Sequence, residues 1–308
     1  MNFKNIIFTL VIVAFIAVLI MKQESPKQNT TQTKPTIALS TFSLYDITKN
    51  IVGDTAEPFM ILPFGVDAHS YEPNPKQVAK IYKSALVVYS GAGLEPWIDG
   101  FEFKNKAINM SLHVELRKLE GHHHHHSHNN SESSTDPHYW LDFTNMIKAT
   151  NLITKELIAL FPKHKKLYET NRDKYITMLK NLDKEYAKNL STCRLDTIVV
   201  NHNAFSYLAS RYGFEVEALS GLSPEAQPSA KSMTEIIEHV KEHKLKTIFF
   251  ESFVSDKAIK SIAQEAKVQV DVLQPLGNIT ADEAKQNLTY EDIMKENLEK
   301  LSKALECH

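Results

Sequence analysis

Residues 58–69 read PFMILPFGVDAH, an apolar run that leads into a loop with glycine, aspartate and histidine. We expect the apolar part, Pro58 to Leu62, to form a buried strand, because a short continuous hydrophobic run is typical of strands that are covered on both faces. In α/β sheets, ligands bind in loops beyond the carboxyl ends of the strands. This stretch therefore predicts an α/β fold and makes His69 a candidate binding residue.

The residues on either side repeat this pattern of strand, loop and helix. Upstream, residues 36–40 read as a strand, and residues 44–52 read as an amphipathic helix that ends at Gly53. Downstream, residues 76–84 read as a helix and residues 85–90 as another continuous apolar strand. Because units of this kind need crossover connections, they indicate a parallel sheet with flanking helices.

The second half of the chain has the same character. Strands are expected at residues 197–200, 246–250 and 268–273, a helix through Ser210, and a helix that Ser255 caps and that runs through Ala266. The sequence therefore predicts two α/β series in one chain.

A long helical pattern separates the two series. A first apolar stripe runs from Met146 to Leu160, and a second helix begins at Pro162 and continues to Leu190. The second helix is about 28 residues, or roughly 42 Å, long. Its apolar face is formed by Leu167, Tyr175, Leu179, Leu182, Tyr186 and Leu190. We interpret it as a rigid connection between two lobes; a long surface helix on a single domain is the alternative.

Length, composition and charge limit the possible functions. The chain has 308 residues, of which 43% are hydrophobic and 23% charged, so it can bury a core and form two domains. Its net charge of -2 argues against a nucleic-acid partner. The segment Gly91-Ala92-Gly93 lacks the third glycine of a dinucleotide loop, and the sequence contains no Walker motif.

The N-terminal residues indicate export. Lys4 precedes an apolar run from Ile6 to Met21, and a polar linker covers residues 24–35. The run of about 16 residues is roughly 24 Å long as a helix, short of the ~30 Å hydrocarbon core. Residues 1–23 are therefore interpreted as a signal peptide or an uncleaved anchor, and the rest of the chain as extracytoplasmic or periplasmic.

Cysteine content restricts the possible metal ligands. Only Cys193 and Cys307 are present, too few for a thiolate zinc site, so a metal would have to be bound by nitrogen and oxygen. In an oxidising compartment the two could form a disulfide, but two unpaired thiols are equally compatible with the sequence.

Histidine is concentrated in the middle of the chain. A polar segment, 120–135, precedes the sequence DPHYWLD at residues 136–142 and contains His122, His123, His124, His125, His126 and His128. Because this tract is internal and is interrupted by Ser127, we take it as native rather than as an affinity tag. It is either an auxiliary, low-affinity metal collector or sensor, or a solvated insertion without a role in binding.

Three other histidines follow apolar strands or lie in turn-rich loops: His69, His138 and His202. They are 69 and 64 residues apart, so only the fold could bring them together. A set of imidazole nitrogens suits zinc, whereas magnesium, calcium and manganese prefer oxygen.

The motifs around these histidines resemble the metal-binding receptors of zinc- and manganese-uptake ABC transporters. The similar segments are Gly65-x-Asp67-x-His69-x-Tyr71-Glu72-Pro73, Asp136-Pro137-His138-x-Trp140-Leu141-Asp142, His202-x-Ala204-Phe205-x-Tyr207-Leu208-Ala209, Arg211-Tyr212-Gly213, Phe249-Phe250-Glu251 and Pro275-Leu276-Gly277. The resemblance covers the chain from Thr36 to the C-terminus.

The resemblance implies two lobes, 36–161 and 191–308, joined by a single long helix over 162–190, with the metal in the cleft between them. It implies that His69 and His138 come from the first lobe and His202 from the second. Histidine at the third position is similar to the zinc branch of the family. A membrane permease is the implied partner, and the receptor is expected to be a monomer.

One position departs from the family pattern. Gln274 stands where the family commonly has an aspartate before Pro-Leu-Gly, and an amide oxygen is a poor zinc ligand. We therefore expect three histidines plus water, or a carboxylate from Asp67, Glu72 or Glu251. Glu251 is the better candidate for orienting a ligating imidazole. Trp140 and Tyr139 are expected to wall the site.

We therefore expect a zinc-binding receptor, not an enzyme, that delivers Zn²⁺ to an ABC-transporter permease. The alternatives are a manganese or iron receptor of the same family, a zinc-dependent hydrolase, since three histidines and a water also describe a catalytic site, and a metal-storage or adhesion protein.

Overall fold

The first half of the chain forms a four-stranded parallel sheet in the order β2–β1–β3–β4. The computed structural model describes residues 34–119, 134–221, 229–251 and 257–308. The strands are β1 (Thr36–Leu39), β2 (Glu57–Met60), β3 (Leu86–Tyr89) and β4 (Ala107–Asn109), and every pair is parallel. The predictions for the first three strands and for a parallel sheet are confirmed.

Both faces of this sheet are covered, which explains its continuous apolar strands. In β1, Ile37 and Leu39 belong to the main hydrophobic core, whereas Ala38 lies in a smaller cluster with Ile81 and Val87. Alternate residues of a strand point to opposite faces, so a strand buried on both sides must be apolar at every position.

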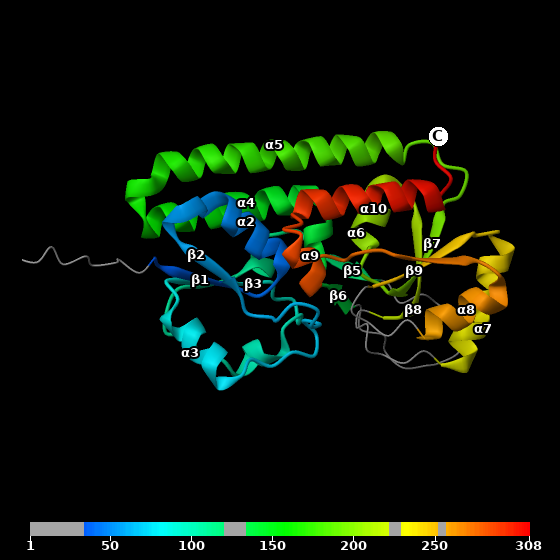
Figure 1. The fold of residues 1–308 in the computed structure, drawn as a ribbon, viewed down its shortest axis with the longest axis horizontal. Helices are drawn as coiled ribbons and strands as arrows, with labels where there is room; N and C mark the ends of the chain where they lie inside the picture. The colour runs from blue at the N-terminus through cyan, green and yellow to red at the C-terminus, as the bar shows by residue number, and fades with distance from the viewer. Residues whose placement is uncertain (1–33, 120–133, 222–228, 252–256) are drawn as a thin grey trace, which may run out of the picture. The chain divides into compact units, whose positions relative to one another are not determined.

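The first sheet is flanked by helices α2 (Phe42–Val52), α3 (Pro75–Lys83) and α4 (Phe143–Leu160) (Figure 1). The start of α3 is fixed by a capping box, in which the Asn74 side chain accepts from the backbone of Gln77 and the Gln77 side chain accepts from that of Asn74. A short antiparallel pair, β5 (Arg117–Leu119) and β6 (Ser134–Asp136), precedes α4.

The second half contains two parallel strand pairs. β7 (Thr197–His202) pairs with β8 (Glu215–Ser220), and β9 (Thr247–Phe250), which lies next to β7, pairs with β10 (Gln269–Val272). The helices of this half are α6 (Ser206–Tyr212), α7 (Ala230–Glu242) and α8 (Lys257–Ala266). The three predicted strands are confirmed. The expected cap at Ser255 lies outside the described residues.

The long helix is α5 (Lys165–Asn189), and a 3-10 turn over Pro162–His164 precedes it. Turn and helix together span nearly the predicted range, but the predicted apolar face is wrong at Leu167, which is 42% exposed. The neighbouring Tyr168 is buried instead. Two adjacent apolar residues lie about 100° apart around a helix, so the sequence alone did not decide which one faces the core.

α5 follows α4 and leads towards β7, and it packs against α2, α4 and α10 (Tyr290–Ala304) (Figure 1). The main core contains Phe143, Tyr186 and Ile293 together with strand residues from both halves of the chain. The long helix is therefore supported along its length by other helices, and its role as the connection between two lobes remains a prediction.

The C-terminal segment is tied to the start of the second half. Cys193 and Cys307 form a disulfide, which decides between the two alternatives left open by the sequence. A short helix, α9 (Ala281–Lys285), precedes α10. The predicted signal or anchor at 1–23, most of the linker and the histidine tract at 122–128 lie outside the described residues. Within the described parts of the chain, no helix has the length and apolarity needed to span a bilayer.

Candidate metal centre

His138 follows β6 and is held by the carboxylate two residues before it. Asp136 Oδ1 accepts both the backbone N–H of His138, at 2.9 Å, and a hydrogen bond from its Nδ1, at 2.8 Å. Asp136 is fully buried and also accepts hydrogen bonds from the hydroxyls of Ser206, through Oδ2, and Tyr207, through its backbone carbonyl. These contacts fix the imidazole so that Nε2 is its free ring nitrogen.

His69 lies in the loop between β2 and α3 and has a similar local arrangement. The carboxylate of Asp67 accepts the backbone N–H of His69 at 2.6 Å, which is the turn that an aspartate commonly forms with the residue two positions on. The ring is half-buried, and its Nε2 is buried with no hydrogen-bond partner among the described residues.

His202 is the last residue of β7 and is almost completely buried. Its Nδ1 forms an ion pair with the carboxylate of Glu251, which follows the neighbouring strand β9 and is itself only 2% exposed. A carboxylate at Nδ1 holds the ring and leaves Nε2 for another ligand, as in many zinc sites. This contact fits the orienting role expected of Glu251.

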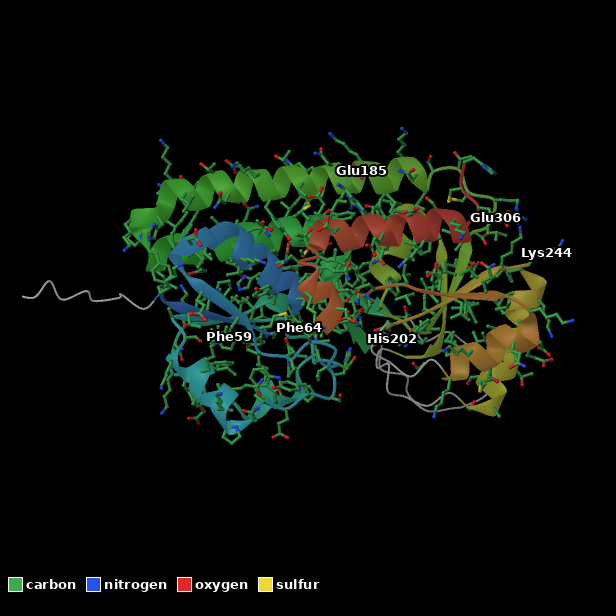
Figure 2. The ribbon with its side chains drawn as sticks, in the orientation of Figure 1. Phe59, Phe64, Glu185, His202, Lys244 and Glu306 are labelled. Carbon is green, nitrogen blue, oxygen red and sulfur yellow. A yellow bond between two sulfur atoms is a disulfide. The ribbon has the colours of Figure 1, made fainter. Side chains whose placement is uncertain are left out.

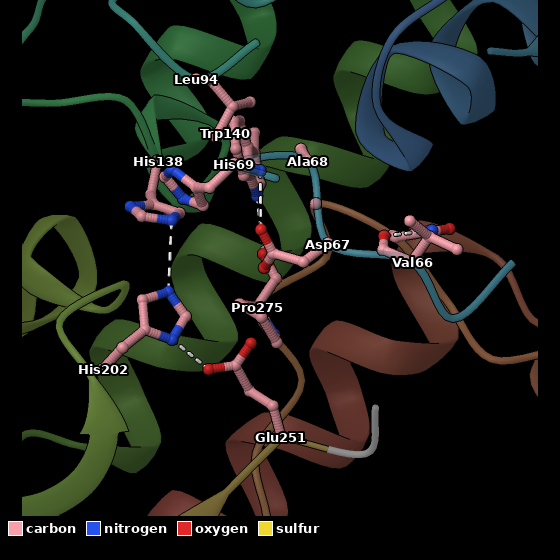
Figure 3. A pocket seen from close by; sticks show the side chains of 12 residues that line it. Val66, Asp67, Ala68, His69, Leu94, His138, Trp140, His202, Glu251 and Pro275 are labelled. Carbon is pink, nitrogen blue, oxygen red and sulfur yellow. Dashed lines mark hydrogen bonds and ion pairs between the residues drawn. The ribbon is translucent and has the colours of Figure 1, made fainter. Parts of the chain in front are cut away.

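The three imidazoles converge (Figure 3). One ring nitrogen from each histidine lies within 4.8 Å of the others, and Nε2 of His138 is 3.4 Å from Nε2 of His202. Nitrogens bound to a tetrahedral zinc ion at about 2.0–2.1 Å lie about 3.3 Å apart. The structure therefore brings together His69, His138 and His202, as predicted, and the distance between His138 and His202 matches that of two ligands of one zinc ion.

Burial and mutual repulsion keep His69 neutral. Desolvation, followed by repulsion from His138 and His202, lowers the pKa of His69 to about 3. For His202, burial acts to lower the pKa, but the Glu251 carboxylate outweighs it and raises the pKa above its ordinary value. A neutral imidazole has a lone pair available, so His69 is in its ligating form at neutral pH.

The pocket around the histidines is small. It is lined by Val66, Asp67, Ala68, His69, Leu94, His138, Trp140, His202, Glu251, Pro275, Gly277 and Asn278. Its cavity of about 20 Å³ has room for about one water-sized particle. This size suits a single ion.

Trp140 forms one wall of the pocket, as expected. Its ring lies edge-on to His138, with centroids 5.4 Å apart, and its Nε1 donates to the carbonyl of Pro275 at 2.6 Å. A Cβ on Gly277 would lie 3.3 Å from the Trp140 ring, so glycine permits this close approach. Tyr139 was also expected to wall the site, but it is fully buried and is not among the residues that line the pocket.

Residues 275–279, in the second half of the chain, form hydrogen bonds with the loop that carries His69. The side-chain amide of Asn278 donates to the carbonyls of Pro63, at 2.6 Å, and Val66, at 2.7 Å. The backbone N–H of Gly65 donates to the carbonyl of Ile279 at 2.9 Å. We refer to residues 275–279 as the strap; it holds the His69 loop against the pocket.

The four candidates for an additional ligand are placed differently. Asp67 and Glu251 line the pocket, whereas Glu72 is exposed and lies outside the lining. Gln274 is buried, and its amide donates to both carboxylate oxygens of Glu283 at 3.1 Å. Gln274 is not among the lining residues, so the structure leaves Asp67, Glu251 or water for the fourth position.

Sequence reasoning did not assign a role to Asp136, Asn278 or Glu283. The signal for Asp136 was present, because Asp-x-His occurs at both Asp67 and Asp136. Glu283 forms a capping box with Thr280 at the start of α9, which the sequence Thr-x-x-Glu could have indicated. Asn278 left no such signal, because its partners are distant in sequence.

Taken together, the fold and the site define an α/β protein in which three imidazoles from distant segments meet in one small pocket. The family described as "ZnuA: Zinc-uptake complex component A periplasmic" matches residues 37–304, and the chain belongs to this family.

Two curated relatives are similar in sequence to this protein over most of its length. The zinc-binding lipoprotein AdcA of Streptococcus pneumoniae is 35% identical over 277 residues, which are 87% of this chain and 55% of that protein. The chain therefore spans about half the length of this relative. The high-affinity zinc uptake system protein ZnuA of Bacillus subtilis is 35% identical over 273 residues, which are 86% of this chain and 85% of that protein.

A solved structure supports the same relationship. The Zn(II)-bound ZnuA-like domain of Streptococcus pneumoniae AdcA superposes with a TM-score of 0.74 at 34% identity, over 88% of this chain and 99% of that one. The α/β fold with parallel sheets and flanking helices, predicted from the sequence, is thus that of known members of the family.

Proposed function

We propose that His69, His138 and His202 bind one Zn²⁺ ion as cargo, and that the protein captures this ion outside the cytoplasm and delivers it to the permease of an ABC transporter. The observation that carries the proposal is the convergence of three ring nitrogens within 4.8 Å. The family and the zinc-binding relatives support it.

The donor set favours zinc over manganese. Three imidazoles offer nitrogen, which zinc accepts readily, whereas manganese prefers carboxylate and water oxygens. The two carboxylates nearest the rings, Asp136 and Glu251, are paired with Nδ1 atoms and so act on the metal through the histidines. Water or Asp67 completes the coordination.

The same geometry supports a receptor rather than a zinc hydrolase. A hydrolase needs a general base near the metal-bound water and space for its substrate. Here Glu251 is paired with His202, Asp67 accepts the backbone N–H of His69, and the cavity of about 20 Å³ admits little more than the ion. The family description, a component of a zinc-uptake complex, also supports a role without catalysis.

Location and organisation complete the proposal. An exported, membrane-tethered position fits the signal or anchor at residues 1–23 and the relatives that are named lipoproteins. We propose a monomer with lobes at 36–161 and 191–308, linked by residues 162–190. The histidine tract at 122–128 would be an auxiliary collector that is dispensable for the tight site.

Competition between zinc and manganese tests the metal assignment. We expect wild-type protein to bind zinc more tightly than manganese, and Gln274→Asp to narrow this preference because it adds a carboxylate near the pocket. Titration of the metal-free proteins with each ion against a chromophoric chelator measures both affinities. A wild-type preference for manganese would overturn the proposal.

Turnover assays test the rival class. The zinc-loaded protein is incubated with ester, amide and carbon dioxide substrates, and we expect no turnover above that of free zinc. Turnover that disappears in His138→Ala would instead identify an enzyme.

A further inference from the structure

A pair of histidines outside the pocket lies at the C-terminal end of α7. His239 and His243 are one helical turn apart, and their rings stack with centroids 4.1 Å apart and an angle of 19° between their planes. Residues four apart on a helix share one face, which is why the two rings meet. His243 is exposed and follows the last residue of α7, directly before Lys244, which is labelled in Figure 2.

The inner ring of this pair has an unsatisfied nitrogen. Nε2 of His239 is buried and has no hydrogen-bond partner among the described residues. A buried polar nitrogen without a partner is unfavourable, so a ligand that accepts its lone pair would stabilise the site. Burial, followed by repulsion from His243, lowers the pKa of His239, which favours the neutral, ligating form.

The surroundings favour a cation. Carboxylates of Glu217, Glu242 and Glu215 are near enough to act on His239 electrostatically. The pair also lies at the C-terminal end of a 13-residue helix, where the helix dipole is negative. Of the two lysines beside it, Lys241 is paired with Glu265 at 4.0 Å.

We propose that His239 and His243 chelate a divalent transition-metal ion such as Zn²⁺ at a second site, separate from the pocket. Two histidines four residues apart on one helix face are an arrangement that binds zinc in other proteins. Because the helix supplies only two ligands, water or a nearby glutamate completes the coordination. The site is therefore weaker than one built from three imidazoles.

Zinc titration by calorimetry tests this site, with residues 122–128 deleted so that the histidine tract does not contribute. We expect one tight and one weaker binding event. His243→Ala should remove the weaker event and leave the tight one unchanged, and because His243 is exposed this change should not disturb folding. His113→Ala, which removes another exposed histidine, is the matched control and should preserve both events.

Two results would contradict the second site: a single binding event in the deletion protein, or a weaker event that survives His243→Ala. His202→Ala separates the two proposals, since it should abolish the tight event and keep the weaker one. If His202→Ala left the tight binding event intact, the proposal that the pocket binds zinc would be wrong. The result for His243→Ala would still decide whether the α7 site exists.

Discussion

The two sides of the pocket are built in different ways. On one side, His69 and His138 each follow an aspartate by two residues, and that aspartate accepts the backbone N–H of the histidine. On the other side, His202 is held by Glu251, which is 49 residues further along the chain and follows a neighbouring strand. The first side is therefore positioned by local turns and the second by the packing of strands.

This difference has consequences for stability. His202 and Glu251 are each 2% exposed, so each depends on the other to compensate a buried polar group. The ring of His69 is only half-buried, and its Nε2 has no partner in the described structure. Loss of His202 should therefore cost more stability than loss of His69, whereas His138, which is buried with Asp136, should resemble His202.

The largest effect is expected from removing single histidines. Loss of a residue that orients a ligand weakens metal binding about 10–100-fold. His69→Ala and His202→Ala should each weaken zinc binding by more than this, because each removes a proposed ligand. His202→Ala should also destabilise the metal-free protein by about 3–5 kcal/mol, because it leaves the Glu251 carboxylate buried without a partner. His69→Ala should cost about 1 kcal/mol or less.

Zinc titration and urea unfolding of the metal-free variants measure both quantities, and His113→Ala serves as the exposed control. Equal losses of stability in His69→Ala and His202→Ala would remove the distinction between the two sides.

Asp46, a buried carboxylate outside the pocket, can be compared with Asp136 and Glu251, because no imidazole among the described residues pairs with it. Asp46 is 3% exposed and accepts hydrogen bonds from neutral donors, the hydroxyl of Tyr175 at 2.7 Å and the amide of Asn50. Burial raises the pKa of Asp46 from 3.8 to about 6. Between these values the folded state binds the proton and the unfolded state does not, so stability falls as pH rises from about 4 to 6.

The side chain at position 46 cannot titrate in Asp46→Asn, so this variant should not show the fall in stability between pH 4 and pH 6. Relative to wild type, the variant should gain about 2.5 kcal/mol in its free energy of unfolding between pH 4 and pH 7. Urea unfolding at both pH values measures the difference. A constant difference between variant and wild type would show that Asp46 keeps an ordinary pKa.

Loss of the orienting carboxylates should have a smaller effect on binding. Glu251→Gln and Asp136→Asn should each weaken zinc binding about 10–100-fold. Asp136→Asn should also lower the melting temperature more than Glu251→Gln, because Asp136 additionally accepts from the His138 backbone and from Ser206. Wild-type zinc affinity in both variants would show that these carboxylates do not act on the site.

The smallest effect is expected at the strap. Asn278→Ala removes two hydrogen bonds to the loop of His69 and should destabilise the protein by about 1–2 kcal/mol. Zinc binding should weaken by less than in Glu251→Gln, because Asn278 bonds to loop carbonyls and not to a ligating imidazole. Asn189→Ala, at the exposed end of α5, is the matched control. Unchanged stability in Asn278→Ala would mean that the strap does not hold the His69 loop.

The histidines of the pocket could be predicted from the sequence, but the carboxylates that hold them only in part: Glu251 was assigned an orienting role and Asp136 was not. Apolar strands followed by histidine-containing loops predicted the α/β fold and singled out His69, His138 and His202. The resemblance to metal receptors implied that these three meet, and the structure brings them together. The roles of Gln274 and Asn278 could not be predicted, because their partners, Glu283 and the carbonyls of Pro63 and Val66, are set by tertiary packing.

The secondary structure that was missed has a similar explanation. β8 contains Glu215 and Glu217 between apolar residues, so it gave no continuous hydrophobic run like the strands buried on both faces. The three-residue strands β4, β5 and β6 are too short to show a period.

X-ray absorption at the zinc edge tests the central claim most directly, on protein that lacks residues 122–128 and carries one equivalent of Zn²⁺. The account predicts three imidazole nitrogens at about 2.0–2.1 Å with one further light ligand, and one fewer imidazole in any form of His69→Ala that still retains zinc. A coordination shell dominated by oxygen, or no retained zinc once the tract is deleted, would contradict it.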